Sequence, residues 1–146
     1  MSLMRRRTHD RRLEWWFASQ TLAFGLFLTH PAASMDSTAF IQLLLWMPEN
    51  WWGGAFTLTG GLHITALWIN GRRWWTPYIR STTTIANLVA YFFFLVGFWL
   101  LDRHTTAVAT YGALCVAACI CLYGAAKDAV HARDGIQKGG RSAECH

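Results

Sequence analysis

The stretch WWGGAFTLTGGLHITALWINGRRWWTPYIR, residues 51–80, most constrains what this chain can fold into. Residues 51–70 carry no charge, and a helix of that length rises about 30 Å, the thickness of a membrane's hydrocarbon core. Asn70 and Gly71 are typical of a helix end, two arginines and two tryptophans follow at once, and Thr76 and Pro77 favour the start of another helix. The stretch therefore predicts the inner corner of a transmembrane helical hairpin.

The distribution of charge predicts the topology. Of the 146 residues, 53% are apolar and only 14% are charged, a composition typical of membrane proteins. Twelve of the 13 Lys and Arg residues lie in three short segments between apolar stretches, and Arg103 is the exception. Because cytoplasmic loops are enriched in Lys and Arg, we expect both termini and residues 72–80 in the cytoplasm. The topology thus explains the net charge of +5, and we do not expect nucleic acid as a partner.

We therefore predict an all-α integral membrane protein with four transmembrane helices and N-in/C-in topology. A basic cytoplasmic N-terminus, a four-helix transmembrane domain and a basic cytoplasmic tail are expected at residues 1–14, 15–126 and 127–146. The expected spans are residues 13–30, 51–70, 77–101 and 105–126.

Two segments outside these spans are also expected to be partly helical. Residues 37–47 are too short to span, so we expect a short interfacial helix in the first external loop, serving either as a lid on the bundle end or as a plug or partner surface. The last helix is expected to extend to about Arg133, because Gly135 and the Gly139-Gly140 pair favour an irregular tail beyond it.

Four polar residues are expected at a similar depth in the inner half of the bundle. They are Gln20, His63, Asn87 and Cys119. Polar groups within a membrane are costly and usually face inward, so this layer is the best candidate for a functional site. The alternative is that its hydrogen bonds between helices only fix the packing.

Small residues on the second and fourth spans allow helices to approach closely, either within one chain or between copies. The helix-packing candidates are Gly53, Thr57, Gly60, Gly61, Gly112, Ala113 and Ala117. A second group is expected at the membrane surface, where cationic side chains attract anionic lipids. It comprises Arg5, Arg6, Arg7, Arg11, Arg12, Arg72, Arg73 and Arg80.

Motifs of enzymes and cofactor sites were not found in the sequence. It has no nucleotide-binding glycine loop, no HExxH and no nucleophile elbow. Cys115 and Cys119 share a helix face without further evident ligands, and His30 and His104 lie at helix ends, so we expect no catalytic residue, metal or cofactor. Glu14 invites comparison with the first-helix carboxylate of small four-helix multidrug transporters, but it lies beside two arginines at the membrane edge rather than in mid-bilayer.

Four short motifs carry a resemblance to a known group. A Pro-Glu pair followed by Trp-Gly lies at the start of the second span, and Ala-Leu-x-Ile-Asn-Gly-Arg lies at its end. Pro and Arg open the third span, and Ala-Thr-Tyr-Gly-Ala lies in the fourth. These residues are Pro48, Glu49, Trp52, Gly53, Ala66, Leu67, Ile69, Asn70, Gly71, Arg72, Pro77, Arg80 and Ala109 to Ala113. With them, residues 16–129 resemble small four-span membrane proteins of tailed bacteriophages and prophages, commonly described as hypothetical or holin-like. The resemblance implies phage origin and the host inner membrane, and it carries over no functional residues.

Two functions of different classes follow from these features. The first is a holin-like protein, whose copies oligomerise in the host inner membrane and permeabilise it during lysis; its small size and small-residue faces are typical of that role. The alternative is a non-lytic membrane factor that modifies the host envelope, excludes other phages, or docks a cytoplasmic partner on its basic corner and tail. A small four-helix transporter is the third.

Overall fold

The computed structural model describes residues 2–30, 35, 38–69, 75–101 and 104–143, with side chains described between residues 11 and 130 of these ranges. Every element in the described ranges is helical, so the all-α prediction is confirmed. The elements are α1 (Ser2–Leu28), the 3-10 helix η1 (Thr38–Phe40), α2 (Ile41–Trp46), α3 (Glu49–Ile69), α4 (Thr76–Leu101) and α5 (Thr106–Ala143).

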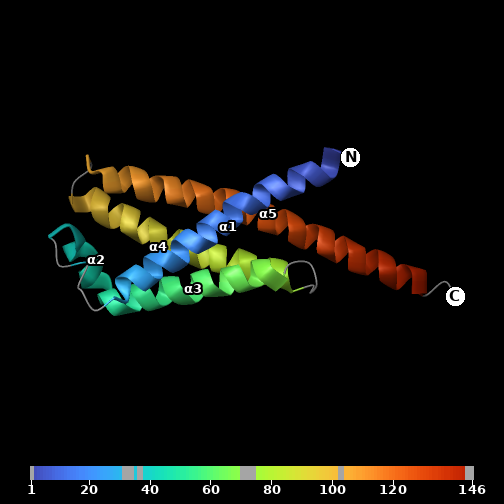
Figure 1. Ribbon diagram of the computed structural model, residues 1–146, viewed down its shortest axis with the longest axis horizontal. Helices are drawn as coiled ribbons and strands as arrows, with labels where there is room; N and C mark the ends of the chain where they lie inside the picture. The colour runs from blue at the N-terminus through green and yellow to red at the C-terminus, as the bar shows by residue number, and fades with distance from the viewer. Residues whose placement is uncertain (1, 31–34, 36–37, 70–74, 102–103, 144–146) are drawn as a thin grey trace.

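The four long helices form an elongated bundle in which each runs opposite to the one before it (Figure 1). The start of α1, the end of α3, the start of α4 and the end of α5 lie at one end, called the inner end below. The short helix α2 lies at the opposite, outer end. Helix α1 packs along α3, α3 along α4, and α4 along α5. Side chains of α1 and α4 also meet across the middle of the bundle.

Two of the described helices are long and apolar enough to cross a membrane: α4, and α5 as far as Val130. The outward faces of these two helices carry large apolar side chains, including Phe92, Leu100, Val116 and Ile120. Water would penalise so much exposed apolar surface, whereas lipid would not. These two helices therefore indicate a membrane protein.

The ends of the helices differ from the sequence-based expectation in three places. Helix α1 begins at Ser2, well before the expected span, and α5 continues to Ala143. The expectation of an irregular tail after Gly135 is wrong, because each glycine weakens a helix by only about 1 kcal/mol and leaves its backbone hydrogen bonds possible. Helix α4 begins at Thr76, and the carbonyl of Trp75 accepts from the N–H groups of the first turn. Thr76 is thus the first helical residue rather than the N-cap. The expected corner at residues 70–74 lies outside the described residues.

Aromatic rings from all four long helices fill the middle and outer half of the bundle. Phe24 of α1, Phe56 of α3, Tyr91 and Phe94 of α4 and Tyr111 of α5 make ring pairs with centroids 5.0–5.6 Å apart. All but Phe24 are at least nine-tenths buried. Such edge-to-face and tilted pairs pack well, so this part of the interior is occupied by protein.

The short helix α2 packs on the outer ends of α3 and α4. A Cβ atom on Gly97 of α4 would lie 3.2 Å from the side chain of Leu43, so the glycine makes room for α2. Trp52 of α3 donates from Nε1 to the Leu43 carbonyl at 3.3 Å, and the rings of Trp46 and Phe93 are 5.4 Å apart. This placement favours the lid over a free partner surface.

Glycines bring α1 and α3 into backbone contact. A Cβ atom on Gly60 would lie 2.6 Å from the backbone nitrogen of Leu22, and one on Gly25 would lie 2.6 Å from Oγ1 of Thr57. Gly53 meets the end of α1 in the same way, at 3.0 Å from its backbone. Two of the packing candidates, Gly53 and Gly60, therefore act within one chain.

The pair Gly60 and Gly61 tests this interface, because the two residues are adjacent and point 100° apart on the helix. In Gly60→Ala the added methyl group meets the backbone of α1, and we expect a loss of about 1–3 kcal/mol in the free energy of unfolding. In Gly61→Ala it meets nothing within 4 Å, so we expect no loss and a gain of up to about 1 kcal/mol from the higher helix propensity of alanine. Unfolding in detergent micelles, followed by circular dichroism, measures both. Equal stability of the two variants would contradict the interface.

Candidate functional site

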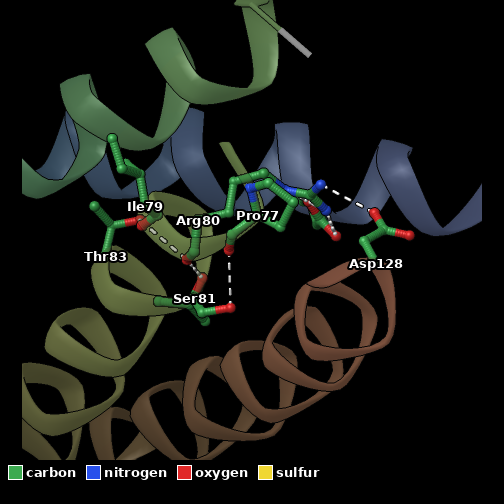
Figure 2. Close-up of polar contacts among 8 residues, drawn as sticks. Pro77, Ile79, Arg80, Ser81, Thr83 and Asp128 are labelled. Carbon is green, nitrogen blue, oxygen red and sulfur yellow. Dashed lines mark hydrogen bonds and ion pairs between the residues drawn. The ribbon is translucent and has the colours of Figure 1, made fainter. Parts of the chain in front are cut away.

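One guanidinium joins three helices at the inner end of the bundle. Arg80 of α4 donates from Nε to Oε2 of Glu14 on α1 at 2.9 Å, and from Nη2 to Oε1 of the same carboxylate at 2.6 Å. Its Nη1 donates to Oδ2 of Asp128 on α5 at 3.0 Å, as Figure 2 shows. Arg80 and Glu14 are each 3% exposed, whereas the side chain of Asp128 is 32% exposed. These three residues are called the charge cluster below.

The hydroxyl groups near Arg80 in the first turns of α4 bond to the helix's own backbone. Ser81 and Thr83 donate their hydroxyl protons to the carbonyls of Pro77 and Ile79, both at 2.9 Å (Figure 2). Serine and threonine commonly bond back to a helix in this way. Their hydroxyls are therefore occupied within α4, and the guanidinium is left to bind the two carboxylates.

The two buried members of the charge cluster, Arg80 and Glu14, depend on each other. A buried unpaired charge is very costly, and a bidentate arginine–carboxylate pair offsets that cost through two charge-assisted hydrogen bonds. Helix α5 makes room for the pair, because a Cβ atom on Gly124 would lie 3.2 Å from Oε1 of Glu14. The carboxylate of Glu14 therefore fits between α4 and the backbone of α5.

A second group of buried polar side chains lies further into the bundle. His63 of α3 and Asn87 of α4 are each 1% exposed. Thr59 of α3 contacts Oδ1 of Asn87 through Oγ1 at 2.5 Å. Both ring nitrogens of His63 and Nδ2 of Asn87 lack a hydrogen-bond partner in the protein. The ring of Phe17 on α1 packs edge-on against His63 at 6.3 Å.

The polar groups end at Tyr91. The hydroxyl of Thr21 on α1 donates to the Phe17 carbonyl at 2.9 Å and lies 3.0 Å from the hydroxyl of Tyr91. Because Thr21 has one proton and gives it to that carbonyl, Tyr91 is the donor to Thr21. The next layer outward is the aromatic packing around Phe94. The interior is therefore polar in its inner half and aromatic in its outer half.

The structure brings together only half of the layer expected from the sequence. His63 and Asn87 are buried, but Gln20 and Cys119 are exposed on the outside of the bundle. Neighbouring residues on a helix point 100° apart, and Thr21 takes the inward position beside Gln20. In the same way Ala118 is buried beside Cys119.

The other candidate residues divide between the interior and the outside. Thr57 lies against Gly25 on α1, whereas a Cβ atom on Gly61 or Gly112 would meet nothing within 4 Å. Ala113 is exposed and Ala117 is partly buried. Of the arginines expected at the membrane surface, Arg12 is exposed and Arg11 partly exposed.

Arg80 does not belong with those surface arginines, because it is buried against Glu14. The side chains of the remaining candidates lie outside the described residues. They are Arg5, Arg6, Arg7, Arg72 and Arg73.

Sequence reasoning missed the charge cluster, although a signal for it exists. Glu14 and Arg80 both lie within a turn of the expected inner ends of their spans, at the same depth and with opposite charge. Asp128 lies just past the expected inner end of the last span. Pairing these acidic residues with the nearest arginine by depth would have suggested the cluster.

Comparisons with known proteins identify no relative. No protein-family model, no curated protein and no solved structure matches this chain. Functional inference therefore rests on the residues and their geometry.

Removing one of the two buried members of the charge cluster should lower the free energy of unfolding far more than removing both of them together. Arg80→Met leaves Glu14 buried without a partner, and we expect a loss of about 3–5 kcal/mol in the free energy of unfolding. Arg80→Met combined with Glu14→Leu should recover most of it. Asp128→Asn, at the exposed side, should cost about 0.2–1 kcal/mol. Denaturation in detergent micelles measures all three. The structure is contradicted if Arg80→Met is no less stable than Asp128→Asn.

Proposed function

We propose that this chain crosses the membrane four times, with both termini in the cytoplasm. Helices α1 and α3, 27 and 21 residues long, complete the bundle with α4 and α5 (Figure 1). The basic segments of the chain belong to the inner end, where the excess of Lys and Arg predicts the cytoplasm. Outward side chains of α3, such as Leu58 and Trp68, are apolar and exposed, as lipid contact requires.

Thiol labelling in intact cells tests this topology. In a chain whose native cysteines are replaced by alanine, Trp75→Cys marks the inner end and His104→Cys the outer end. A membrane-impermeant maleimide added from outside should modify the thiol at position 104 and reach position 75 only after the cells are lysed. Labelling of position 75 in intact cells would contradict the proposed orientation.

We further propose that the chain is a phage-encoded, holin-like protein of the host inner membrane. The observation that carries this proposal is the filled interior. Rings from all four long helices meet in its middle and outer half, around Phe56, Tyr91 and Phe94. A single copy packed in this way offers no aqueous path, so a membrane lesion would have to form between copies. The resemblance of residues 16–129 to phage membrane proteins supports the same role.

The outer face of α3 offers a surface for such assembly. Gly53 and Gly60 face α1, while Gly54 and Gly61, their neighbours, face outward with open space beside them. Bare glycines let a helix of another copy approach the backbone closely. The same helix thus carries one glycine face for its own chain and one that is available to a second copy.

Inducible expression in a bacterium tests the lytic role. We expect expression of the native chain to stop growth and collapse the membrane potential, measured with a potential-sensitive dye. Gly61→Leu adds bulk to the outer face only, so it should reach the membrane at a normal level but delay or prevent the collapse. Ala23→Leu, at an exposed position of α1, is the control. Continued growth and unchanged potential at high levels of the native chain would refute the holin role.

The projecting end of α5 favours a second candidate, the non-lytic membrane factor. Beyond the bundle, α5 continues as a helix to Ala143, away from the other three long helices (Figure 1). A basic helix extending into the cytoplasm can dock an acidic partner. Cells that keep their potential while the chain accumulates in the membrane would favour this candidate.

The transporter is less well supported. Glu14 is buried, but its carboxylate is bound by Arg80 and does not resemble an unpaired carboxylate that exchanges protons.

A further inference from the structure

Polar atoms without partners are concentrated between α3 and α4. His63 is 1% exposed, and neither of its ring nitrogens has a hydrogen-bond partner in the protein. Asn87, also 1% exposed, has none at Nδ2. A buried polar group left unpaired costs about 1–3 kcal/mol. Because buried polar atoms nearly always have partners, several orphans in one place call for an occupant.

One of the two polar atoms of the Asn87 amide lacks a partner, whichever way the amide is turned. Thr59 donates its hydroxyl proton to the Ala55 carbonyl at 2.8 Å, and the same hydroxyl lies 2.5 Å from Oδ1 of Asn87. One proton cannot serve both acceptors, and an amide turned over would instead donate from Nδ2 to Thr59. Either the nitrogen or the oxygen of Asn87 is then left without a partner.

The antiparallel register places His63 next to this orphan. Thr59 of α3 lies opposite Asn87 of α4, so His63, four residues further along α3, lies opposite residues 83 and 84 of α4. This position is one helical turn, about 6 Å, nearer the inner end than Asn87. A molecule with hydrogen bonds of about 2.8 Å to each side spans roughly that distance.

The surroundings select a small neutral occupant. An unpaired charge in an apolar interior is very costly, and the buried charges of Arg80 and Glu14 already pair with each other, so neither is free to pair with a charged occupant. Thr84 cannot donate to His63, because its hydroxyl proton goes to the Arg80 carbonyl at 2.7 Å. A molecule that bridges the two side chains meets one ring nitrogen of His63, which is a donor or an acceptor according to the tautomer, and one atom of Asn87, which is also either; the occupant must therefore be able to donate and to accept.

We propose that His63 and Asn87 bind an internal water molecule that bridges α3 and α4. Water matches the neutral charge, the donor and acceptor requirement, and the span between the two side chains. Phe17 covers the site from α1, and the aromatic rings beyond Tyr91 separate it from the outer end. The hydration site thus belongs to the inner, polar half of the bundle. This inference concerns a single copy and does not depend on the holin role.

Magic-angle-spinning NMR of the full chain in lipid bilayers tests the site. With ¹⁵N-labelled histidine, we expect magnetisation to pass from water protons to the ring nitrogens of His63, as it does for the exposed His30 and His104. Asn87→Leu should abolish the transfer to His63 and leave the other two unchanged. Asn87→Val, whose smaller apolar side chain likewise cannot bind water, serves in its place if the leucine variant does not fold.

Two outcomes would overturn the inference. One is a native chain in which His63 receives no magnetisation from water while His30 and His104 do. The other is a transfer to His63 that persists in folded Asn87→Leu, because the water would then not depend on the bridge.

Discussion

The inner end of the bundle depends on one guanidinium. Arg80 binds a fully buried carboxylate on α1 and a half-exposed one on α5, and its own helix supplies no further side-chain ligand. Two carboxylates on different helices cannot both lie at this depth without a cation between them. Helices α1, α4 and α5 are therefore tied at one point, while glycines hold α3 against α1. The remaining packing is mostly apolar, apart from hydrogen bonds such as those between Thr59 and Asn87 and between Thr21 and Tyr91.

This arrangement divides the interior by chemistry. The charge cluster, His63, Asn87 and Tyr91 follow one another from the inner end towards the middle, and only the charge cluster consists of charged side chains. Beyond Tyr91 the contacts are between aromatic rings, and α2 packs on the outer ends of α3 and α4. In a bilayer, polar groups would lie in the cytoplasmic half, and the outer half would be sealed by side chains.

Much of the fold could be predicted from the sequence because the relevant signals are local. A long uncharged stretch, a glycine after it and a cluster of arginines indicate where helices begin and end. What each side chain faces could not be predicted in the same way, since it depends on how each helix is rotated. Gln20 and Thr21 differ by 100°, and that difference alone puts one outside and the other inside.

The charge cluster shows the same limit for electrostatics. Arginines near the inner end of a span usually contact the membrane surface, and the sequence therefore predicts a surface position for Arg80. Only the pairing of α1 with α4 across the bundle brings Glu14 to it. His63 and Asn87 were found because a polar residue in an apolar stretch stands out whatever its rotation.

The outward glycines of α3 leave this helix without side chains on part of its surface. In a membrane, the hollow beside Gly54 and Gly61 would be filled by acyl chains for as long as a copy stays alone. A second copy can occupy it only by displacing those chains. Acyl chains that fit this space well would then compete with self-association, whereas chains that fit it poorly would favour self-association.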